Sequence, residues 1–400
     1  MTNKVFVTGI GIISSIGDNV EETLKSILEE KSGIGPIKYL KTIHNKDFVV
    51  GEVKHSNEEL IEIAGLSSSC NKVYTRTALL GIIAACEAVK SAGIKDIQFV
   101  STGLISATTV GGIDKSEHYF YDFLNSKNLE YAKTHHCGDS TDKIADTLNI
   151  KGFTTTISTA CSSSANAIML GARLIKNKIL DRVIVGGTDS LSKYTLNGFN
   201  TLMILDKELC KPFDENRKGL NLGEGAGFII LESEKSVKKD NKRILCEVKG
   251  YANTNDAYHQ TASSPEGFGA YLSMKKALDK NGLIPADIDY INVHGTGTDN
   301  NDISEGKALK KLFGENIPEF SSTKSFTGHT LGAAGGIEAV ISVLSITKGF
   351  IPPNLNFSNT ISELGITPQS ELIKNINIKT VLSNSFGFGG NNSSLIFSEP

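Results

Sequence analysis

Short β-branched runs alternate with amphipathic stretches from one end of this sequence to the other, and no other feature restricts its fold as strongly. Between these runs, residues 75–92 and 270–281 carry apolar side chains at steps of three and four positions, as helices with one buried face do. Strand-like and helix-like segments that alternate in this way predict an α/β protein. The β-branched runs are residues 5–8, 99–105, 154–158, 182–187, 227–231, 244–248, 290–294, 380–384 and 394–397.

Several stretches recur in the same order in the two halves of the chain. Residues 223–233 and 389–399 both pass from a glycine-rich turn into an apolar strand, and residues 158–161 and 322–325 each precede a predicted helix. These repeats alone leave two interpretations open. One is a duplicated pair of α/β halves with a site between them, and the other is the general similarity of any two α/β segments.

The composition excludes several classes of protein. Among 400 residues, 41 Lys and Arg face 44 Asp and Glu, so the chain lacks the overall basic charge of a dedicated nucleic-acid-binding protein. The six cysteines show no C-x-x-C spacing, and we expect reduced thiols with neither a zinc module nor a disulfide framework. No uninterrupted apolar run approaches the roughly 18 residues that span a bilayer, and the first residues resemble no secretion signal. We therefore expect a cytoplasmic protein that does not insert into membranes.

Cys161 stands where a predicted strand turns into a predicted helix. Its sulfur would face the positive end of the helix dipole and nearby backbone N–H groups, which favour a thiolate nucleophile. The alternative, from position alone, is a small buried hydrophobic side chain. One face of the predicted helix carries Cys161, Ala165, Ile168, Met169, Ala172 and Ile175.

Three further segments carry groups suited to acid–base and acyl-transfer chemistry. His294 ends a predicted strand and opens a loop rich in glycine and threonine, where it would act as a general acid or base or as a hydrogen-bond donor. Lys324, His329 and Glu338 fall within 15 residues on a glycine- and alanine-rich stretch. Residues 383–391 form a glycine-hinged loop whose backbone would supply an oxyanion donor and whose aromatic side chains would gate a cavity. Taken singly, each segment also has a packing or turn explanation, and none matches a nucleotide-binding loop.

Taken together and in this order, the segments resemble the β-ketoacyl-[acyl-carrier-protein] synthases of the two-histidine, KAS I/II-like type, within the thiolase-fold condensing enzymes. The resemblance covers nearly the whole chain and implies a thiolase-like fold, with duplicated α/β halves in a layered αβαβα architecture. Residues 1–242 would form the half with the nucleophilic cysteine, and residues 243–400 the half with the two histidines. The matching segments are residues 7–14, 159–162, 211–214, 223–227, 294–298, 324–338 and 384–390.

The resemblance implies a role for each main site residue. Cys161 would take the acyl group from an acyl-carrier thioester, with the backbone N–H groups of Cys161 and Phe388 as the oxyanion hole. His294 and His329 would donate hydrogen bonds to the thioester carbonyl of the malonyl carrier and stabilise the enolate that forms as carbon dioxide leaves. Two neutral imidazoles suit that task.

The other residues would support these groups or contact substrate. By resemblance, Lys324 and Glu338 would organise the two histidines electrostatically. The substrate contacts would be Thr296 and Thr298 on the phosphopantetheine arm, Val110 in the acyl tunnel near a dimer contact, and Phe386. The implied reaction requires no cofactor and no catalytic metal. In some relatives a structural monovalent cation is held at positions that match Asn292, Glu338, Ser383 and Asn384.

The implied function is decarboxylating Claisen condensation that gives a 3-oxoacyl-[acyl-carrier-protein] in fatty-acid elongation, as in a KAS II-like acyltransferase. The implied partners are an acyl carrier protein and a second copy in a homodimer, with a heterodimer as the alternative. Residues 113–150 do not match the usual fatty-acid enzymes, which keeps a specialised polyketide or aryl-polyene ketosynthase as an alternative. A non-catalytic chain-length-factor-like subunit is disfavoured because the cysteine and both histidines are present, and a thiolase because the C-terminal loop lacks a cysteine. For the run His135, His136 and Cys137, a loop or interface role is expected over a metal site.

Overall fold

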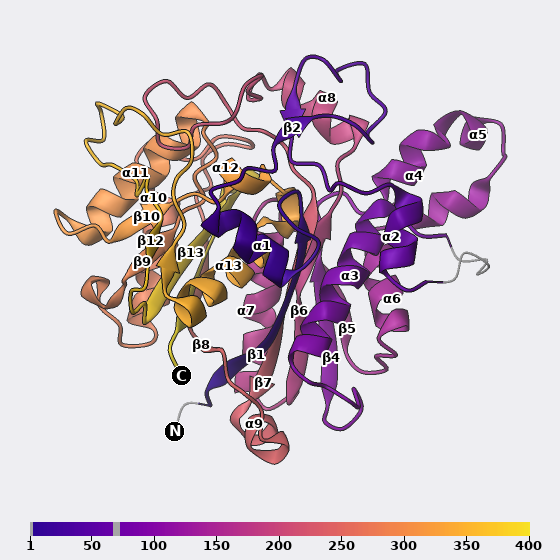
Figure 1. Cartoon of the computed structure of the whole chain (residues 1–400), viewed down its shortest axis with the longest axis horizontal. Coiled ribbons are helices and arrows are strands. Elements are labelled where there is room, and N and C mark those ends of the chain that lie inside the picture. Colours follow the sequence, from indigo (N-terminus) through magenta and orange to yellow (C-terminus); the bar gives the residue numbers. More distant parts are fainter. Residues whose placement is uncertain (1–2, 67–72) are drawn as a thin grey trace.

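The computed structural model describes residues 3–66 and 73–400, and it contains two α/β halves that share one ten-stranded sheet. The first half, in indigo to magenta, and the second, in orange to yellow, lie side by side (Figure 1). The first half contributes β1 (Val5–Ser14), β4 (Thr102–Ala107), β5 (Thr154–Ile157), β6 (Arg182–Asp189) and β7 (Gly225–Ser233). The second contributes β8 (Cys246–Asn255), β9 (Tyr290–Asn292), β10 (Glu319–Ser321), β13 (Thr380–Gly387) and β14 (Asn391–Ser398).

The two halves repeat the same strand order. The sheet runs β5-β4-β6-β7-β1 in the first half and β10-β9-β13-β14-β8 in the second, counted from each outer edge. In both halves the first three strands run parallel to one another. Each of the last two strands pairs antiparallel with the strand before it in this order. The halves meet where β1 and β8 pair antiparallel. The duplication expected from the repeats is therefore confirmed, while the division into domains at residues 242–243 stays a prediction.

Helices form three layers around this sheet. The central layer is α7 (Ser163–Lys176) and α13 (Ala334–Lys348), which contact each other and each pack on strands of both halves. On the outside, α3 (Arg76–Ser91) covers β1 and β7, while α10 (Phe268–Asp279) covers β8 and β14 beside α11 (Asp299–Phe313). The αβαβα layering is as expected. Both outer helices α3 and α10 match the amphipathic stretches of the sequence within two residues.

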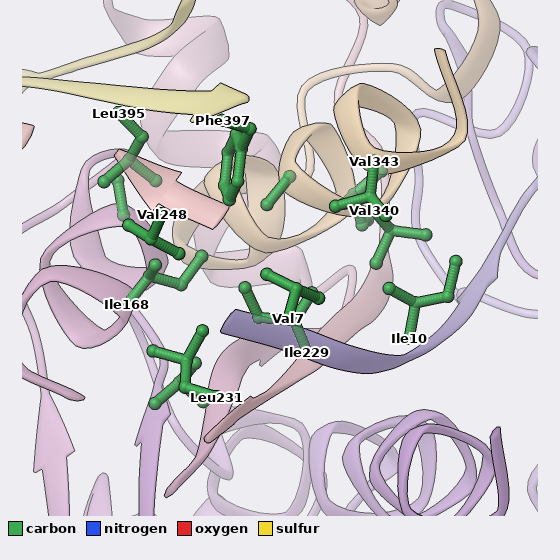
Figure 2. Close-up of a cluster of buried hydrophobic side chains, with 14 of the residues drawn as sticks. Val7, Ile10, Ile168, Ile229, Leu231, Val248, Val340, Val343, Leu395 and Phe397 are labelled. Carbon is green, nitrogen blue, oxygen red and sulfur yellow. The ribbon is translucent and has the colours of Figure 1, made fainter. Parts of the chain in front are cut away.

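The main hydrophobic core crosses from one half to the other. Val7 and Ile229 come from the first half, Val248 and Phe397 from the second, and Val340 of α13 packs between them (Figure 2). Because the two halves share this core, the turns that each half presents are held at fixed positions relative to one another. Among the described residues, one helical stretch, Leu331–Lys348, has the length and apolar character to cross a membrane, and most of it is buried in this core.

A glycine contact brings α13 against β7. A Cβ atom on Gly227 would lie 2.4 Å from the backbone carbonyl carbon of Gly336. We expect Gly227→Ala to lower the free energy of unfolding by about 1–3 kcal/mol, as overpacking does. Urea denaturation measures this change. Gly198→Ala is the control, because Gly198 lies in a helix with open space around it and the substitution is expected to be neutral or stabilising.

The remaining elements are short or lie at the periphery. They are α1 (Val20–Leu28), β2 (Gly35–Pro36), β3 (Val49–Val50), α2 (Asn57–Ile63), α4 (Ile113–His118), α5 (Phe120–Leu124), η1 (Leu129–His135), α6 (Gly138–Thr147), α8 (Lys193–Thr201), α9 (Glu234–Asp240), η2 (Pro285–Asp287), α12 (Lys324–Thr327), η3 (Leu331–Ala333), β11 (Phe350–Ile351), β12 (Ile373–Lys374) and η4 (Phe388–Gly390). Residues 113–147 thus form a helical lobe beside β5, in which the rings of Tyr119 and Tyr131 stack at 4.0 Å between centroids.

Candidate active site

Cys161 lies in the sharp turn between β5 and α7. Ala160 has φ 53°, a left-handed conformation that is strained for a residue with a side chain. The turn is held by a hydrogen bond of 2.8 Å from Thr159 N to Ser163 Oγ and one of 3.0 Å from Ser163 N to Ala160 O. Only 5% of Cys161 is exposed. The sulfur therefore has a fixed position at the start of a central helix.

Burial, and not the helix terminus, dominates the ionisation of this thiol. Burial raises the pKa of Cys161 to about 11, although the charge of Lys324 and the backbone N–H groups of Phe388 and Cys161 favour the thiolate. The backbone N–H groups at the start of α7 favour the thiolate, as expected, but burial outweighs them and keeps Cys161 a thiol near pH 7. A thiol in this pocket becomes nucleophilic only when a base takes its proton.

His329 is placed to be that base. Its Nε2 atom lies 3.0 Å from Sγ of Cys161, and the residue lies between α12 and η3. Burial and the charge of Lys324 lower the pKa of His329 well below its usual value, so the imidazole is neutral near pH 7 and its unprotonated nitrogen accepts a proton.

His294 completes a group of three on the opposite side of the pocket. It follows β9, and its ring stands edge-on to that of His329 with 5.4 Å between centroids. Burial, Lys324 and His329 lower the pKa of His294 well below its usual value. Ligand atoms of Cys161, His294 and His329 lie within 4.8 Å of one another, the only such group in residues 3–66 and 73–400. The nearby ammonium of Lys324 disfavours a metal ion there and favours neutral rings that donate hydrogen bonds.

A buried ion pair ties the histidine loop to the central layer. Lys324, at the start of α12, pairs with Glu338 of α13, and both side chains are 3% exposed. Lys324 Nζ also donates a hydrogen bond of 2.6 Å to the backbone oxygen of His294, and Ser385 Oγ donates one of 3.3 Å to Glu338. Removing one member of a buried pair leaves an uncompensated charge, which costs about 3–5 kcal/mol. The pair therefore fixes both the position and the electrostatic surroundings of the histidines.

Two carboxylates of α11 cradle the loop that begins at His294, and the sequence interpretation missed them. Glu305 accepts hydrogen bonds from the backbone N–H groups of His294 at 2.9 Å and Gly295 at 2.8 Å. Asp302 accepts them from Thr296 at 3.1 Å and, more weakly, from Gly297. A signal for this cradle exists in the sequence, because carboxylates three residues apart at a helix start share the face that points back to the preceding loop.

The surroundings of Glu305 suit the cation that the resemblance suggests. Burial raises the pKa of Glu305 to about 7, and in the described part of the chain no hydrogen bond or ion pair joins it to a cationic side chain. Asn384 Nδ2 donates to it at 3.1 Å. Asn292 is fully buried with neither side-chain polar atom hydrogen-bonded, and it pairs with Ser383 in the adjacent strand. In the described residues the Asn292 amide oxygen is thus free to coordinate, and together with the buried Glu305 carboxylate it suits a monovalent cation.

Phe388 lies in the turn between β13 and β14, against Cys161. Its backbone N–H favours the Cys161 thiolate, which places two N–H donors at the sulfur. A Cβ on Gly387 would lie 3.1 Å from the Cys161 nitrogen, closer than an ordinary van der Waals contact, so glycine here eases the close approach of the two turns. The Phe388 ring stacks on Phe199 of α8 at 5.6 Å between centroids, a partner that the sequence did not reveal, and Phe386 lies 5.9 Å from the His294 ring.

A cavity of about 300 Å³ leads to this centre. Cys161, both histidines, Phe386 and Phe388 line it, as do Thr296 and Thr298, whose hydroxyls are 2.9 Å apart. Lys218 and Met203 lie on its exposed rim, and Met203 is 86% exposed. Seven of the ten predicted site residues thus line one cavity, and Lys324 and Glu338 are buried beside it, where Lys324 contacts His294.

Val110 does not line this cavity in the single chain. It is half-buried in a turn whose Thr109 N–H donates to Asp189 at 2.9 Å, and Gly332 N, close to His329, donates to the same carboxylate at 2.7 Å. The turn is thus attached to the catalytic region, while the tunnel role of Val110 stays a prediction. His135, His136 and Cys137 belong to no cluster of potential metal ligands in the described residues.

Comparison with known proteins agrees with this geometry. The family models "Beta-ketoacyl synthase, N-terminal domain" and "Beta-ketoacyl synthase, C-terminal domain" match residues 2–236 and 245–358. The chain is 33% identical to 3-oxoacyl-[acyl-carrier-protein] synthase 2 of Staphylococcus aureus strain N315, over 98% of each protein. It is 32% identical to the enzyme of that name from Coxiella burnetii, over 99% of this chain and 98% of that protein.

Solved structures share the whole fold. The ishigamide ketosynthase/chain length factor superposes with a TM-score of 0.93 at 29% identity and full coverage of both chains. The ketosynthase ApeO, in complex with its chain length factor ApeC from Xenorhabdus doucetiae, matches with a TM-score of 0.84 at 30% identity, over 100% of this chain and 98% of that one. The fold is therefore the thiolase-like fold expected, and the chain belongs to the β-ketoacyl synthase family.

Proposed function

We propose that this chain catalyses the decarboxylating Claisen condensation of an acyl thioester with malonyl-[acyl-carrier-protein], which gives 3-oxoacyl-[acyl-carrier-protein] in fatty-acid elongation. The observation that carries the proposal is the buried group of one thiol and two neutral histidines, with Nε2 of His329 3.0 Å from Sγ of Cys161. The relatives named 3-oxoacyl-[acyl-carrier-protein] synthase 2 support it.

In the first half-reaction, His329 takes the proton of Cys161 at Nε2 and the thiolate attacks the thioester carbonyl carbon. The negative oxygen of the tetrahedral intermediate accepts hydrogen bonds from the backbone N–H groups of Cys161 and Phe388. The intermediate collapses to the acyl-enzyme, and the phosphopantetheine sulfur leaves with the proton that His329 took at Nε2, so the ring is neutral again. Burial and Lys324 disfavour a cationic His329, and exchange with water in the vacated cavity gives the neutral ring its N–H at Nε2.

In the second half-reaction, the malonyl thioester carbonyl accepts hydrogen bonds from His294 and His329. As the C–C bond to the carboxylate breaks and carbon dioxide leaves, these donors stabilise the enolate oxygen. The enolate carbon attacks the acyl carbon on Cys161 and releases the Cys161 thiolate, which takes a proton from solvent and returns to the thiol. Thr296 and Thr298 bind the phosphopantetheine arm along the cavity wall.

The test is direct observation of both products. Intact-mass analysis after incubation with a panel of acyl carriers should show an acyl adduct on the protein, and subsequent malonyl carrier should remove it with formation of a 3-oxoacyl carrier. A protein that takes no acyl group from any carrier, or takes one and never releases a 3-oxoacyl product, would contradict the proposal.

A monovalent cation beside the histidine loop belongs to this proposal. Asn292, Ser383, Asn384 and Glu305 would hold it, whereas Glu338, which the resemblance also names, is already paired with Lys324. A cation there would neutralise the buried Glu305 carboxylate. It would also stiffen the loop that begins at His294, because backbone N–H groups of that loop donate hydrogen bonds to Glu305. Neither half-reaction draws on it chemically.

The proposed partner is an acidic acyl carrier protein that docks at the rim near Lys218. We expect Lys218→Glu to weaken carrier association about threefold to tenfold at low ionic strength, because a rim charge mainly steers encounter. Surface plasmon resonance from low to high salt measures the effect, with Lys238→Glu on α9 as a control away from the cavity. If carrier affinity changes neither with salt concentration nor with either substitution, the docking surface is mainly apolar.

We also propose a homodimer in which the edge of the sheet at β5 and the lobe of residues 113–147 meet a second copy. In the described residues β5 pairs on one side only, with β4, and Phe120 and Tyr121 of the lobe are exposed. An unpaired strand edge beside exposed aromatic side chains favours association.

The acyl tunnel is proposed to run past Val110 toward that contact. Val110→Phe should keep activity on short acyl carriers and lose it on long ones, because a tight tunnel accepts extra methylenes only with strain of about 1–3 kcal/mol. Turnover of carriers of increasing chain length measures the profile. An unchanged profile would mean that the tunnel runs elsewhere.

A ketosynthase of a specialised polyketide or aryl-polyene pathway is the second candidate. The similarity to ketosynthases described with chain length factors, together with the unusual residues 113–150, favours it. In that case the partner would be a related subunit, and conjugated acyl carriers would be better substrates than saturated ones of equal length. The carrier panel described above distinguishes the two candidates.

A further inference from the structure

A cluster of amides and hydroxyls joins the two turns that supply the backbone N–H donors. Oδ1 of Asn391 accepts hydrogen bonds from Ser162 Oγ at 2.8 Å, Asn166 Nδ2 at 3.1 Å and Asn253 Nδ2 at 2.5 Å. Ser162 directly follows Cys161, and Asn391 begins β14 three residues after Phe388. The cluster therefore contacts both turns whose N–H groups form the proposed oxyanion hole.

The Phe388 turn needs such an anchor. Gly389 and Gly390 have φ of 77° and 74° and carry no side chain to hold them. The backbone of Gly389 bonds to the end of β8 and to the loop that follows: its oxygen accepts from Asn255 Nδ2, and its N–H donates to the oxygen of Gln260. That loop belongs to the same half as the turn, so these contacts do not set the distance from the turn to Cys161. The Asn391 side chain reaches Ser162 in the other half.

The single hydroxyl proton of Ser162 is shared between Asn391 Oδ1 at 2.8 Å and the Thr159 backbone oxygen at 2.7 Å, while the Asn166 amide, also in the first half, has two protons and keeps its bond to Asn391. Asn166 accepts from Ser393 Oγ at 2.9 Å through its Oδ1 atom, while its Nδ2 donates to Thr159 Oγ1 at 2.9 Å and to Asn391. Asn391 acts in the cluster as an acceptor through one oxygen. An aspartate at this position would present the same acceptor, whereas a leucine of similar size would present none.

We propose that Asn391 is a positioning residue for acyl transfer: its amide oxygen holds the Phe388 turn against the Cys161 turn, so that both N–H groups point at one oxyanion. The inference rests on the proposed function, because an acyl thioester must supply that oxyanion. Decarboxylation of the malonyl carrier uses the histidine pair and does not need this alignment.

The test separates the two half-reactions in three variants of the full chain. Asn391→Leu should slow acylation of Cys161 about 10- to 100-fold, less than outright loss of an oxyanion donor. The same variant should release carbon dioxide from malonyl carrier within about threefold of the wild-type rate. Asn391→Asp should restore acylation to within about fivefold of wild type, since it keeps the acceptor. Asn253→Ala removes a bond to the same oxygen without cutting the contact between halves, and should acylate at the wild-type rate.

Results other than these contradict either the positioning role of Asn391 or the proposed function on which it rests. Wild-type acylation by Asn391→Leu would overturn the positioning role. So would an equal loss in both half-reactions together with a lower thermal midpoint, which would indicate general damage to the fold, or a failure of Asn391→Asp to restore acylation. Wild-type protein that neither takes acyl groups nor releases carbon dioxide would refute the proposed function itself.

Discussion

Cys161→Ser should abolish acyl transfer. In this pocket burial already raises the pKa of the thiol to about 11, and an alcohol, which is far less acidic, cannot deliver its proton to the neutral His329 at a useful rate. By comparison with other enzymes that lose a nucleophile of this kind, the expected loss in kcat is roughly 10⁴–10⁶-fold. Mass spectrometry should place the acyl group of the wild-type enzyme on the peptide that contains Cys161, with no adduct in the variant.

Cys137→Ser is the matched control. Cys137 is half-buried and lies outside the catalytic cavity, and burial raises its pKa as well. Serine at this position should leave acylation unchanged. An adduct on the peptides of Cys137 or Cys210, or full activity of Cys161→Ser, would overturn the assignment of the nucleophile.

His294→Ala and His329→Ala should each slow decarboxylation of malonyl carrier by a factor on the order of 10²–10³, because each removes one donor to the enolate oxygen. The two variants should differ in acylation. His329 touches the sulfur of Cys161, so its loss should slow acylation too, while His294→Ala should retain most of it. Carbon dioxide release and adduct formation are measured separately.

The same prediction has a pH dependence with a definite sign. Because the pKa of both histidines is lowered, protonation of either ring requires acid well below pH 6.5. The neutral donors therefore persist, and decarboxylation should not fall between pH 8 and pH 6.5. His44→Ala, at a surface histidine paired with Asp47, is the control. Wild-type carbon dioxide release by both active-site variants would refute the role in enolate stabilisation.

Features that depend on local pattern could be predicted from the sequence. The amphipathic stretch at residues 75–92 is α3, capped by Thr75, whose hydroxyl accepts from Ala78 N. The repeats correspond to two halves of one sheet with the same strand order, and Cys161, His294 and His329 meet in one buried group. Cys161 and His294 each follow the end of a strand, and the fold brings those ends together, while His329 comes from the segment between α12 and η3.

Features that depend on distant packing could not be predicted. The protonation state of Cys161 depends on how completely the second half covers the start of α7, which a helix-dipole argument ignores. Phe199 stacks on Phe388 across some 190 positions of sequence, and no local pattern connects them. Glu305 was overlooked although its spacing from Asp302 carried a signal, because a charged residue on a helix usually faces solvent.

The repeated strand order also explains how one chain handles two chemically different substrates. In each half, the second strand of the order lies next to the outer edge: β4 is followed by the turn with Val110, and β9 by His294. These two positions are topologically equivalent, yet under the proposed function one lines the path of the growing acyl chain and the other activates the incoming malonyl unit. Under that function, the duplicated framework would place the two substrate-handling turns at equivalent strand ends, and the side chains at those ends would set the two roles apart.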